Sequence, residues 1–230
     1  MSVINDPVLQ RMLARLHDAS DAEITSVMAH YEAHVGADGL PRAEDADRLK
    51  EFMSDKFVSL DRDKAEFCYQ LCRAIGARRI VEVGTSYGVS TLYLAAAVRD
   101  NMRVGGTGAG VVIGTEYEPA KVKAARANFA EVGLSKFIDL REGDLRETLK
   151  HIDGPVDFVL ADIWFKMAQP ALELITPHLR NGAIVICDNT QQYRSSYASY
   201  FEFLNDPANR FSTMTLPFAG GLEMSVHSKP

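Results

Sequence analysis

The sequence has few cysteines, no long apolar run and no secretory signal, and each absence narrows the possibilities. Its three cysteines are odd in number and lie among apolar residues, which favours buried thiols over a disulfide framework. No apolar stretch reaches the roughly 18 residues of a membrane span, and the N-terminus lacks the basic and apolar regions of a signal peptide. We therefore expect a cytoplasmic protein that does not act at a membrane.

The chain also lacks the excess of basic residues that holds a nucleic acid. Its formal net charge is −6 at pH 7, and its pI is about 5.5. The composition, 47% hydrophobic and 24% charged over 230 residues, is ordinary for a chain with a full-sized core. A small molecule is therefore the expected substrate.

From residue 61 onward, helical patterns alternate with short apolar strands. We expect strands at 79–83, 111–115, 137–141, 156–161 and 183–187, and the helices between them predict a parallel sheet covered on both faces. The last two strands, 211–216 and 222–227, are joined by five residues, too few for a crossover helix. The prediction is a doubly wound, mostly parallel seven-stranded α/β sheet with an antiparallel C-terminal hairpin.

The N-terminal quarter has a different pattern. Apolar residues at helical spacing predict two helices between residues 8 and 35, interrupted at 18–21, and another helix near 49–53 after a polar connection at 36–47. We divide the chain into a helical cap, residues 1–56, and an α/β domain, residues 57–230. The cap is expected to cover a pocket or to form a homodimer contact.

A glycine-rich turn follows the first strand of the sheet. Ligands of open parallel sheets bind at this carboxyl edge, where glycines let the backbone approach and the next helix offers free N–H groups. The segment lacks the G-x-G-x-x-G pattern, which argues against a nicotinamide oxidoreductase, and a glycine turn alone is also common strand-to-helix geometry. The candidate cofactor-binding residues here are Glu82, Gly84, Ser86, Gly88 and Ser90.

Acidic residues end the next two strands. Glu116 stands where an acid accepts the hydroxyls of a ribose in nucleoside-binding sheets. The following strand leads to Asp144 and Leu145, where an adenine ring could be held. The alternative for Glu116 is a solvated charge at a strand end.

Three oxygen-bearing side chains end two further strands. Asp162 follows one, and Asp188 and Asn189 end its expected neighbour, so the three should meet beside the glycine turn. Two carboxylates and an amide oxygen suit a hard cation such as Mg²⁺. Aspartate and asparagine at strand ends also form ordinary turns, and that interpretation stays open.

The order of these motifs resembles the metal-dependent O-methyltransferases, the catechol and caffeoyl-CoA group, from about residue 57 to the C-terminus. The resemblance implies a class I, Rossmann-like fold that binds S-adenosylmethionine. It assigns Glu82, Gly84 and Ser90 to the methionine end of the cofactor, Glu116 to the ribose, Asp144 and Leu145 to the adenine, and backbone contact to Leu60.

The resemblance also implies a reaction: methyl transfer to a hydroxyl of a small, catechol-like acceptor, assisted by a divalent cation on Asp162, Asp188 and Asn189. The catalytic candidates are Asp162 and Lys166, which lies four residues beyond it instead of the family's three. Lys166 is a base or an ordinary solvated lysine, and Trp164 and residues 217–224 match the acceptor pocket. The alternatives are a metal-independent methyltransferase of this fold and a non-catalytic cofactor-binding module.

Overall fold

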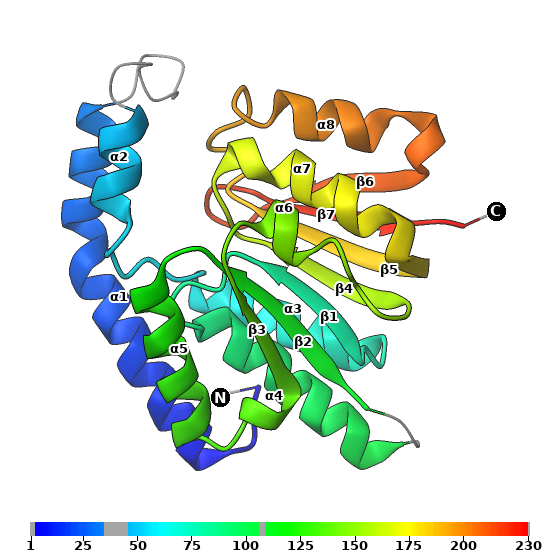
Figure 1. The fold of residues 1–230 in the computed structure, drawn as a ribbon, viewed down its shortest axis with the longest axis horizontal. Coiled ribbons are helices and arrows are strands. Elements are labelled where there is room, and N and C mark those ends of the chain that lie inside the picture. The colour runs from blue at the N-terminus through cyan, green and yellow to red at the C-terminus, as the bar shows by residue number, and fades with distance from the viewer. Residues whose placement is uncertain (1–2, 35–45, 106–108, 230) are drawn as a thin grey trace.

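The computed structural model describes residues 3–34, 46–105 and 109–229, and its centre is one seven-stranded sheet (Figure 1). The order is β3-β2-β1-β4-β5-β7-β6; the first five strands pair in parallel, and β7 runs antiparallel to β5 and β6. The predicted fold class is therefore confirmed. The strands are β1 (Arg79–Val83), β2 (Val111–Glu116), β3 (Ile138–Glu142), β4 (Val156–Ala161), β5 (Leu179–Asp188), β6 (Phe211–Leu216) and β7 (Leu222–His227).

Helices cover both faces of the sheet (Figure 1). One face packs against α1, α3, α4 and α5, and the other against α6, α7 and α8. The helices are α1 (Pro7–Ala33), α2 (Ala46–Met53), α3 (Arg62–Ala74), α4 (Val89–Val104), α5 (Pro119–Glu131), α6 (Leu145–Thr148), α7 (Phe165–Ile175) and α8 (Ala198–Asn205), with short 3-10 turns η1 (Ser135–Phe137), η2 (Thr176–His178) and η3 (Pro207–Asn209).

The central strands are apolar on both sides because both of their faces are covered. Successive side chains of a strand point to opposite faces, so Ile80 packs in the layer of α3 and α4 while Val81 packs in the layer of α7 and α8. Phe158 and Val159 of β4 divide in the same way. This alternation fixes the register, since a slip of one residue would exchange the two faces.

Helix α1 is continuous, so the predicted break at residues 18–21 is wrong. Asp18 and Asp21 are exposed, and the buried Ser20 accepts a hydrogen bond from the Ser59 N–H (3.0 Å). Each polar residue therefore faces solvent or has a partner, and a single aspartate or serine lowers helix stability by only about 0.5 kcal/mol. Tertiary contacts outweigh this local preference.

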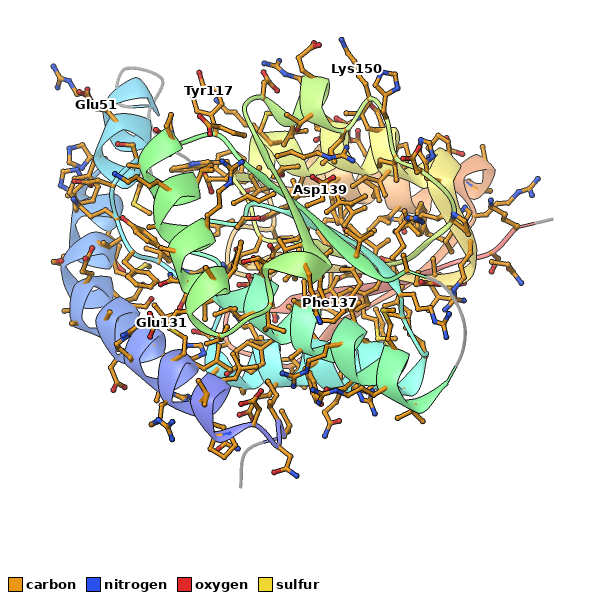
Figure 2. All side chains as sticks on the ribbon, turned by 60° about the horizontal axis from the view of Figure 1, so that its bottom comes forward. Glu51, Tyr117, Glu131, Phe137, Asp139 and Lys150 are labelled. Carbon is orange, nitrogen blue, oxygen red and sulfur yellow. The ribbon has the colours of Figure 1, made fainter. Side chains whose placement is uncertain are left out.

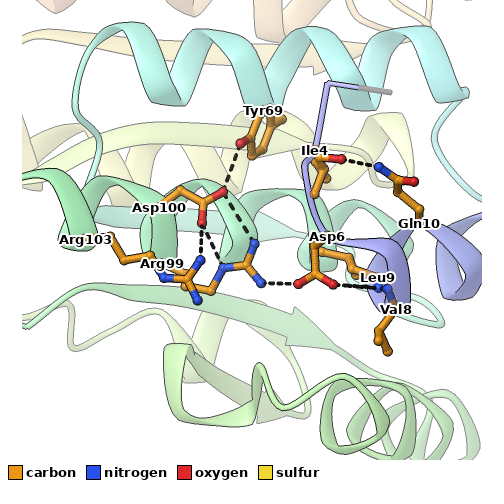
Figure 3. Close-up of polar contacts among 9 residues, drawn as sticks. All are labelled: Ile4, Asp6, Val8, Leu9, Gln10, Tyr69, Arg99, Asp100 and Arg103. Carbon is orange, nitrogen blue, oxygen red and sulfur yellow. Dashed lines mark hydrogen bonds and ion pairs between the residues drawn. The ribbon is translucent and has the colours of Figure 1, made fainter. Parts of the chain in front are cut away.

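The first half of α1 is fixed to the domain by apolar and ionic contacts. Arg15 pairs with Glu131 at 2.9 Å, and Figure 2 shows Glu131 at the end of α5. Figure 3 shows the buried Arg99 guanidinium between Asp6, which caps α1, at 2.7 Å and Asp100 at 2.9 Å. The Tyr69 hydroxyl of α3 also donates to Asp100 (2.9 Å). Helices α1, α3 and α4 thus share one polar network.

The N-terminal helix also shares the apolar core of the α/β domain. Leu9, Met12, Leu13 and Leu16 belong to the same buried cluster as α3, α4 and α5. The division at residue 56 stays a prediction, and residues 36–45 of the predicted polar connection lie outside the described residues. Across the described ranges, no helix has both the length and the apolar character needed to cross a membrane.

Candidate cofactor and cation site

The glycine turn between β1 and α4 forms the floor of the site. Gly84 and Gly88 have φ values of +91° and +85°, in the left-handed region that favours glycine. A Cβ at Gly84 would collide with the carbonyl oxygen of Asp162, and one at Gly88 with the ring of Phe129. Only glycine therefore allows β1 to lie this close to the end of β4 and to α5.

Glu82 supports this turn from the protein interior. Its carboxylate is fully buried and accepts hydrogen bonds from the Thr85 hydroxyl (2.9 Å) and the Thr91 hydroxyl. Burial raises the pKa of Glu82, while these hydroxyl donors act against the shift. Of the predicted turn residues, Gly84 and Ser86 line the cavity, whereas Glu82, Gly88 and Ser90 lie behind its wall.

Glu116 ends β2 with both carboxylate oxygens held by the backbone. Its Oε2 accepts from the Ser86 N–H (2.7 Å), and its Oε1 accepts from the Glu118 N–H (2.9 Å). A carboxylate oxygen accepts more than one hydrogen bond, so each oxygen keeps capacity for a hydroxyl of a ligand. The carboxylate lines the cavity, in a fixed orientation suited to two adjacent ribose hydroxyls.

The predicted adenine contacts lie next to Glu116. The Gly143 N–H donates to the Glu116 carbonyl oxygen (2.9 Å), which joins the end of β3 to β2. Asp144 caps α6 by accepting from the Arg146 N–H (2.9 Å), and the buried Leu145 adds an apolar surface to the cavity wall. The exposed Tyr117, in the loop after β2, also lines the cavity (Figure 2).

Asp162 and Asp188 meet where β4 and β5 end. The two strands are parallel neighbours with Ala161 opposite Cys187, so the residues that follow are adjacent. Burial and the nearby Asp188 raise the pKa of Asp162 to about 8. Burial also raises the pKa of Asp188, which is 4% exposed, while the Lys64 ammonium acts against this shift. The structure therefore brings these two carboxylates together.

Asn189 completes the cluster through an unusual backbone conformation. Its φ is +58°, and its Nδ2 donates to Asp188 Oδ2 (3.1 Å), which leaves the amide oxygen available to a ligand. A Cβ at Gly220 would lie 2.5 Å from that oxygen. The glycine in the turn between β6 and β7 is therefore needed for the side chain of Asn189 to take this position.

Lys64 is a member of the cluster that the sequence analysis missed. Its side chain on α3 is 1% exposed, and its Nζ lies 2.8 Å from Asp188 Oδ1 and 2.8 Å from Asp61 Oδ2. The sequence does contain a signal for its burial, because helical spacing places Lys64 on the same face of α3 as Cys68 and Cys72. A lysine on such a face needs a carboxylate partner.

The charges of this cluster fit a divalent cation. Asp61 and Asp188 share the ammonium of Lys64, while burial and the nearby Asp188 raise the pKa of Asp162, which a cation bound beside it would lower. Among the described residues, no group of three or more His, Cys, Asp or Glu side chains is placed to hold a metal ion. The candidate ligands here are the two carboxylates and the amide oxygen of Asn189. Oxygen ligands of this kind suit Mg²⁺.

One cavity of about 630 Å³ contains both the Glu116 end and the carboxylate cluster. Its outer wall includes Ile24, Val27 and Met28 from the second half of α1, with Trp164 and Tyr193 on the other side. This half of α1 therefore covers the pocket, one of the two roles expected of the N-terminal helices.

Two further candidates lie outside the cavity surface. Leu60 is 2% exposed, although its neighbours Ser59 and Asp61 line the cavity. Lys166 is exposed at the start of α7 and is not among the lining residues. The structure thus brings the cation candidates and about half of the cofactor candidates to one cavity. The candidates outside its lining are Leu60, Glu82, Gly88, Ser90 and Lys166.

Comparisons with known proteins match this arrangement. Residues 81–190, from β1 to the residues after β5, match the family described as a methyltransferase domain. A catechol O-methyltransferase from Mycobacterium tuberculosis is 29% identical over 133 residues, and one from Niastella koreensis is 27% identical over 140 residues. These matches cover 57% of this chain and 57% and 58% of the two relatives, so the chain spans little more than half the length of the curated relatives it matches.

The fold is found in solved O-methyltransferase structures. A putative O-methyltransferase from Klebsiella pneumoniae has a TM-score of 0.70 at 20% identity, covering 99% of this chain and 92% of its own. An O-methyltransferase from Bacillus cereus, solved in complex with SAH, has a TM-score of 0.68 at 19% identity, covering 98% and 93%. Residues 81–190 therefore match a methyltransferase domain, and the fold of the described chain is the one found in these O-methyltransferase structures.

Proposed function

We propose that this protein transfers a methyl group from S-adenosylmethionine to a hydroxyl oxygen of a small aromatic, catechol-like acceptor, assisted by a divalent cation. The observation that carries the proposal is the shared cavity, in which the Glu116 carboxylate lies at one end and Asp162, Asp188 and Asn189 at the other. A cofactor bound along this edge would direct its methionine end toward the carboxylate cluster.

In this proposal each end of the cofactor has its own residues. Glu116 accepts the ribose hydroxyls, and the backbone at Gly84 and Ser86 lies against the methionine end. Leu145 packs on the adenine ring, next to the N-cap of α6. The support is that all four residues line the same cavity, at the ends of the neighbouring strands β3, β2 and β1.

Asp162, Asp188 and Asn189 would hold the cation, and its chemistry there would be to stabilise the deprotonated hydroxyl of the acceptor, whose ordinary pKa is about 10. The chain itself positions the acceptor. Apolar side chains of α1 and the Trp164 ring line the outer part of the cavity, which favours an aromatic body and limits access of water.

A metal-independent methyltransferase of the same fold is the second candidate, and one observation favours it. Asp188 already pairs with a cation of the chain, the Lys64 ammonium at 2.8 Å. In that case the carboxylates would orient the acceptor hydroxyl by hydrogen bonds alone.

Methyl transfer from labelled S-adenosylmethionine to a panel of catechols separates these functions. The proposed function predicts turnover that is lost with EDTA and restored by Mg²⁺. Turnover indifferent to EDTA would support the metal-independent candidate. Cofactor binding with no transfer to any acceptor would contradict both candidates and favour a non-catalytic binding module. A folded Asp188→Asn variant should lose most of its Mg²⁺-dependent turnover, whereas the exposed Glu131→Gln variant should keep it.

A further inference from the structure

The carboxylate cluster contains a permanent positive charge. The Lys64 ammonium is 1% exposed and lies 2.8 Å from both Asp188 Oδ1 and Asp61 Oδ2. Helix α3 packs against α4 in the buried core on that face of the sheet, and Lys64 lies on its buried face. The ammonium is held beside Asp188 by its two ion pairs.

Every other charged group that faces the cluster is acidic. Asp162 extends from the end of β4, Asp61 precedes α3, and the buried Glu82 on β1 adds a negative potential at Asp162. Among the ion pairs recorded for the described residues, Asp188 pairs only with Lys64. One ammonium thus lies among the carboxylates of Asp61, Asp162 and Asp188, so the acidic groups of the cluster outnumber its basic group.

We propose that Lys64 is a positioning residue that sets the affinity of the cluster for its divalent cation. The inference rests on the cation of the proposed function. The ammonium pairs with the Asp188 carboxylate at 2.8 Å and holds it in place. It also repels a second cation nearby, because like charges a few ångströms apart in a buried site interact strongly. The result is a cation site that binds and releases readily.

Mn²⁺ binding tests this without turnover, by measuring the EPR signal of free Mn²⁺ in titrations of the purified protein. Lys64→Gln keeps a hydrogen-bond donor near Asp188 but removes the charge, and we expect at least about tenfold tighter Mn²⁺ binding. Lys64→Arg keeps the charge and should stay within about threefold of wild type. Lys150→Gln, an exposed lysine that pairs with Glu147, should not change the affinity. Unchanged or weaker binding by folded Lys64→Gln would overturn the proposal.

A second variant covers the case that Lys64→Gln does not fold. The Asp61 side chain is 56% exposed, so Asp61→Asn should fold. This variant removes one negative charge, so the Lys64 ammonium has only Asp188 as an ionic partner. Because the cluster is then less negative, Mn²⁺ binding should weaken by at least about threefold. Unchanged or tighter binding in Asp61→Asn would contradict the charge argument.

The outcomes separate this inference from the proposed function. If wild type and Lys64→Gln bind Mn²⁺ equally, only the inference fails. If neither protein binds Mn²⁺, the cation of the proposed function fails together with it. If Lys64→Gln binds Mn²⁺ and wild type does not bind it at any concentration tested, the native cluster holds no divalent cation, and the inference fails together with the cation of the proposed function.

Discussion

Replacing Glu116 by glutamine changes the proposed ribose contact with little change in shape. In the native chain, the Ser86 and Glu118 N–H groups each donate to one carboxylate oxygen. A glutamine offers one oxygen and one NH₂ group, so the NH₂ group must face one of these backbone donors. The variant therefore loses one acceptor for the ribose and places two donors against each other.

The size of the effect follows from the bond that is lost. A hydrogen bond to a charged group contributes about 1.5–3 kcal/mol. Glu116 is only half-buried, so the lower part of this range applies, about 1.5–2 kcal/mol. Since about 1.4 kcal/mol corresponds to a tenfold change, affinity for the cofactor should fall by about 10- to 30-fold. Glu116→Ala, which removes both acceptors, should lose at least as much.

Isothermal titration with S-adenosylhomocysteine measures this loss directly. Glu131→Gln serves as the control, because it makes the same chemical change at an exposed residue outside the cavity. Thermal melting of both variants shows whether the fold is kept. An unchanged affinity in a folded Glu116→Gln protein would refute the assignment of Glu116 to the ribose.

Three further outcomes are expected. Arg99→Met removes a buried guanidinium from its carboxylate partners and should lower the free energy of unfolding by about 2–3 kcal/mol in urea titrations, whereas the exposed Arg103→Met should change it by less than about 0.5 kcal/mol. Burial lowers the pKa of His17 below its ordinary value of 6.5, so as the pH falls the histidine is protonated in the unfolded chain before it is protonated in the folded one. The free energy of unfolding should therefore fall as the pH drops below about 6.5, by up to about 1.4 kcal/mol per pH unit. The His17→Gln variant should lack this pH dependence. Lys166→Ala should retain more turnover than Asp162→Ala, because only Asp162 lines the cavity; equal losses in an assay of methyl transfer would contradict this.

The sheet and the positions of its candidate ligand-binding residues followed from local patterns. Buried parallel strands have continuous apolar sequences, and each strand ends where polar residues and glycines begin. Because parallel strands share a carboxyl edge, Glu116, Asp162 and Asp188 had to meet there once the strand order was known. The strand order in the structure brings them to one cavity.

Contacts between distant segments were the part that local patterns did not predict. The break expected in α1 is absent because Ser20 binds the backbone of Ser59, 39 residues away. Lys64 was missed because its role depends on Asp188, on a strand more than a hundred residues later. The wall that α1 adds to the cavity likewise depends on how a long helix packs across the domain.

The most direct test of the account is a crystal structure of the protein with S-adenosylhomocysteine and Mn²⁺, with anomalous diffraction measured to locate the metal. The account predicts the ribose hydroxyls on Glu116 and one anomalous peak within coordination distance of Asp162, Asp188 and Asn189. A cofactor bound away from Glu116, or a fully soaked crystal without a peak at these three residues, would contradict it.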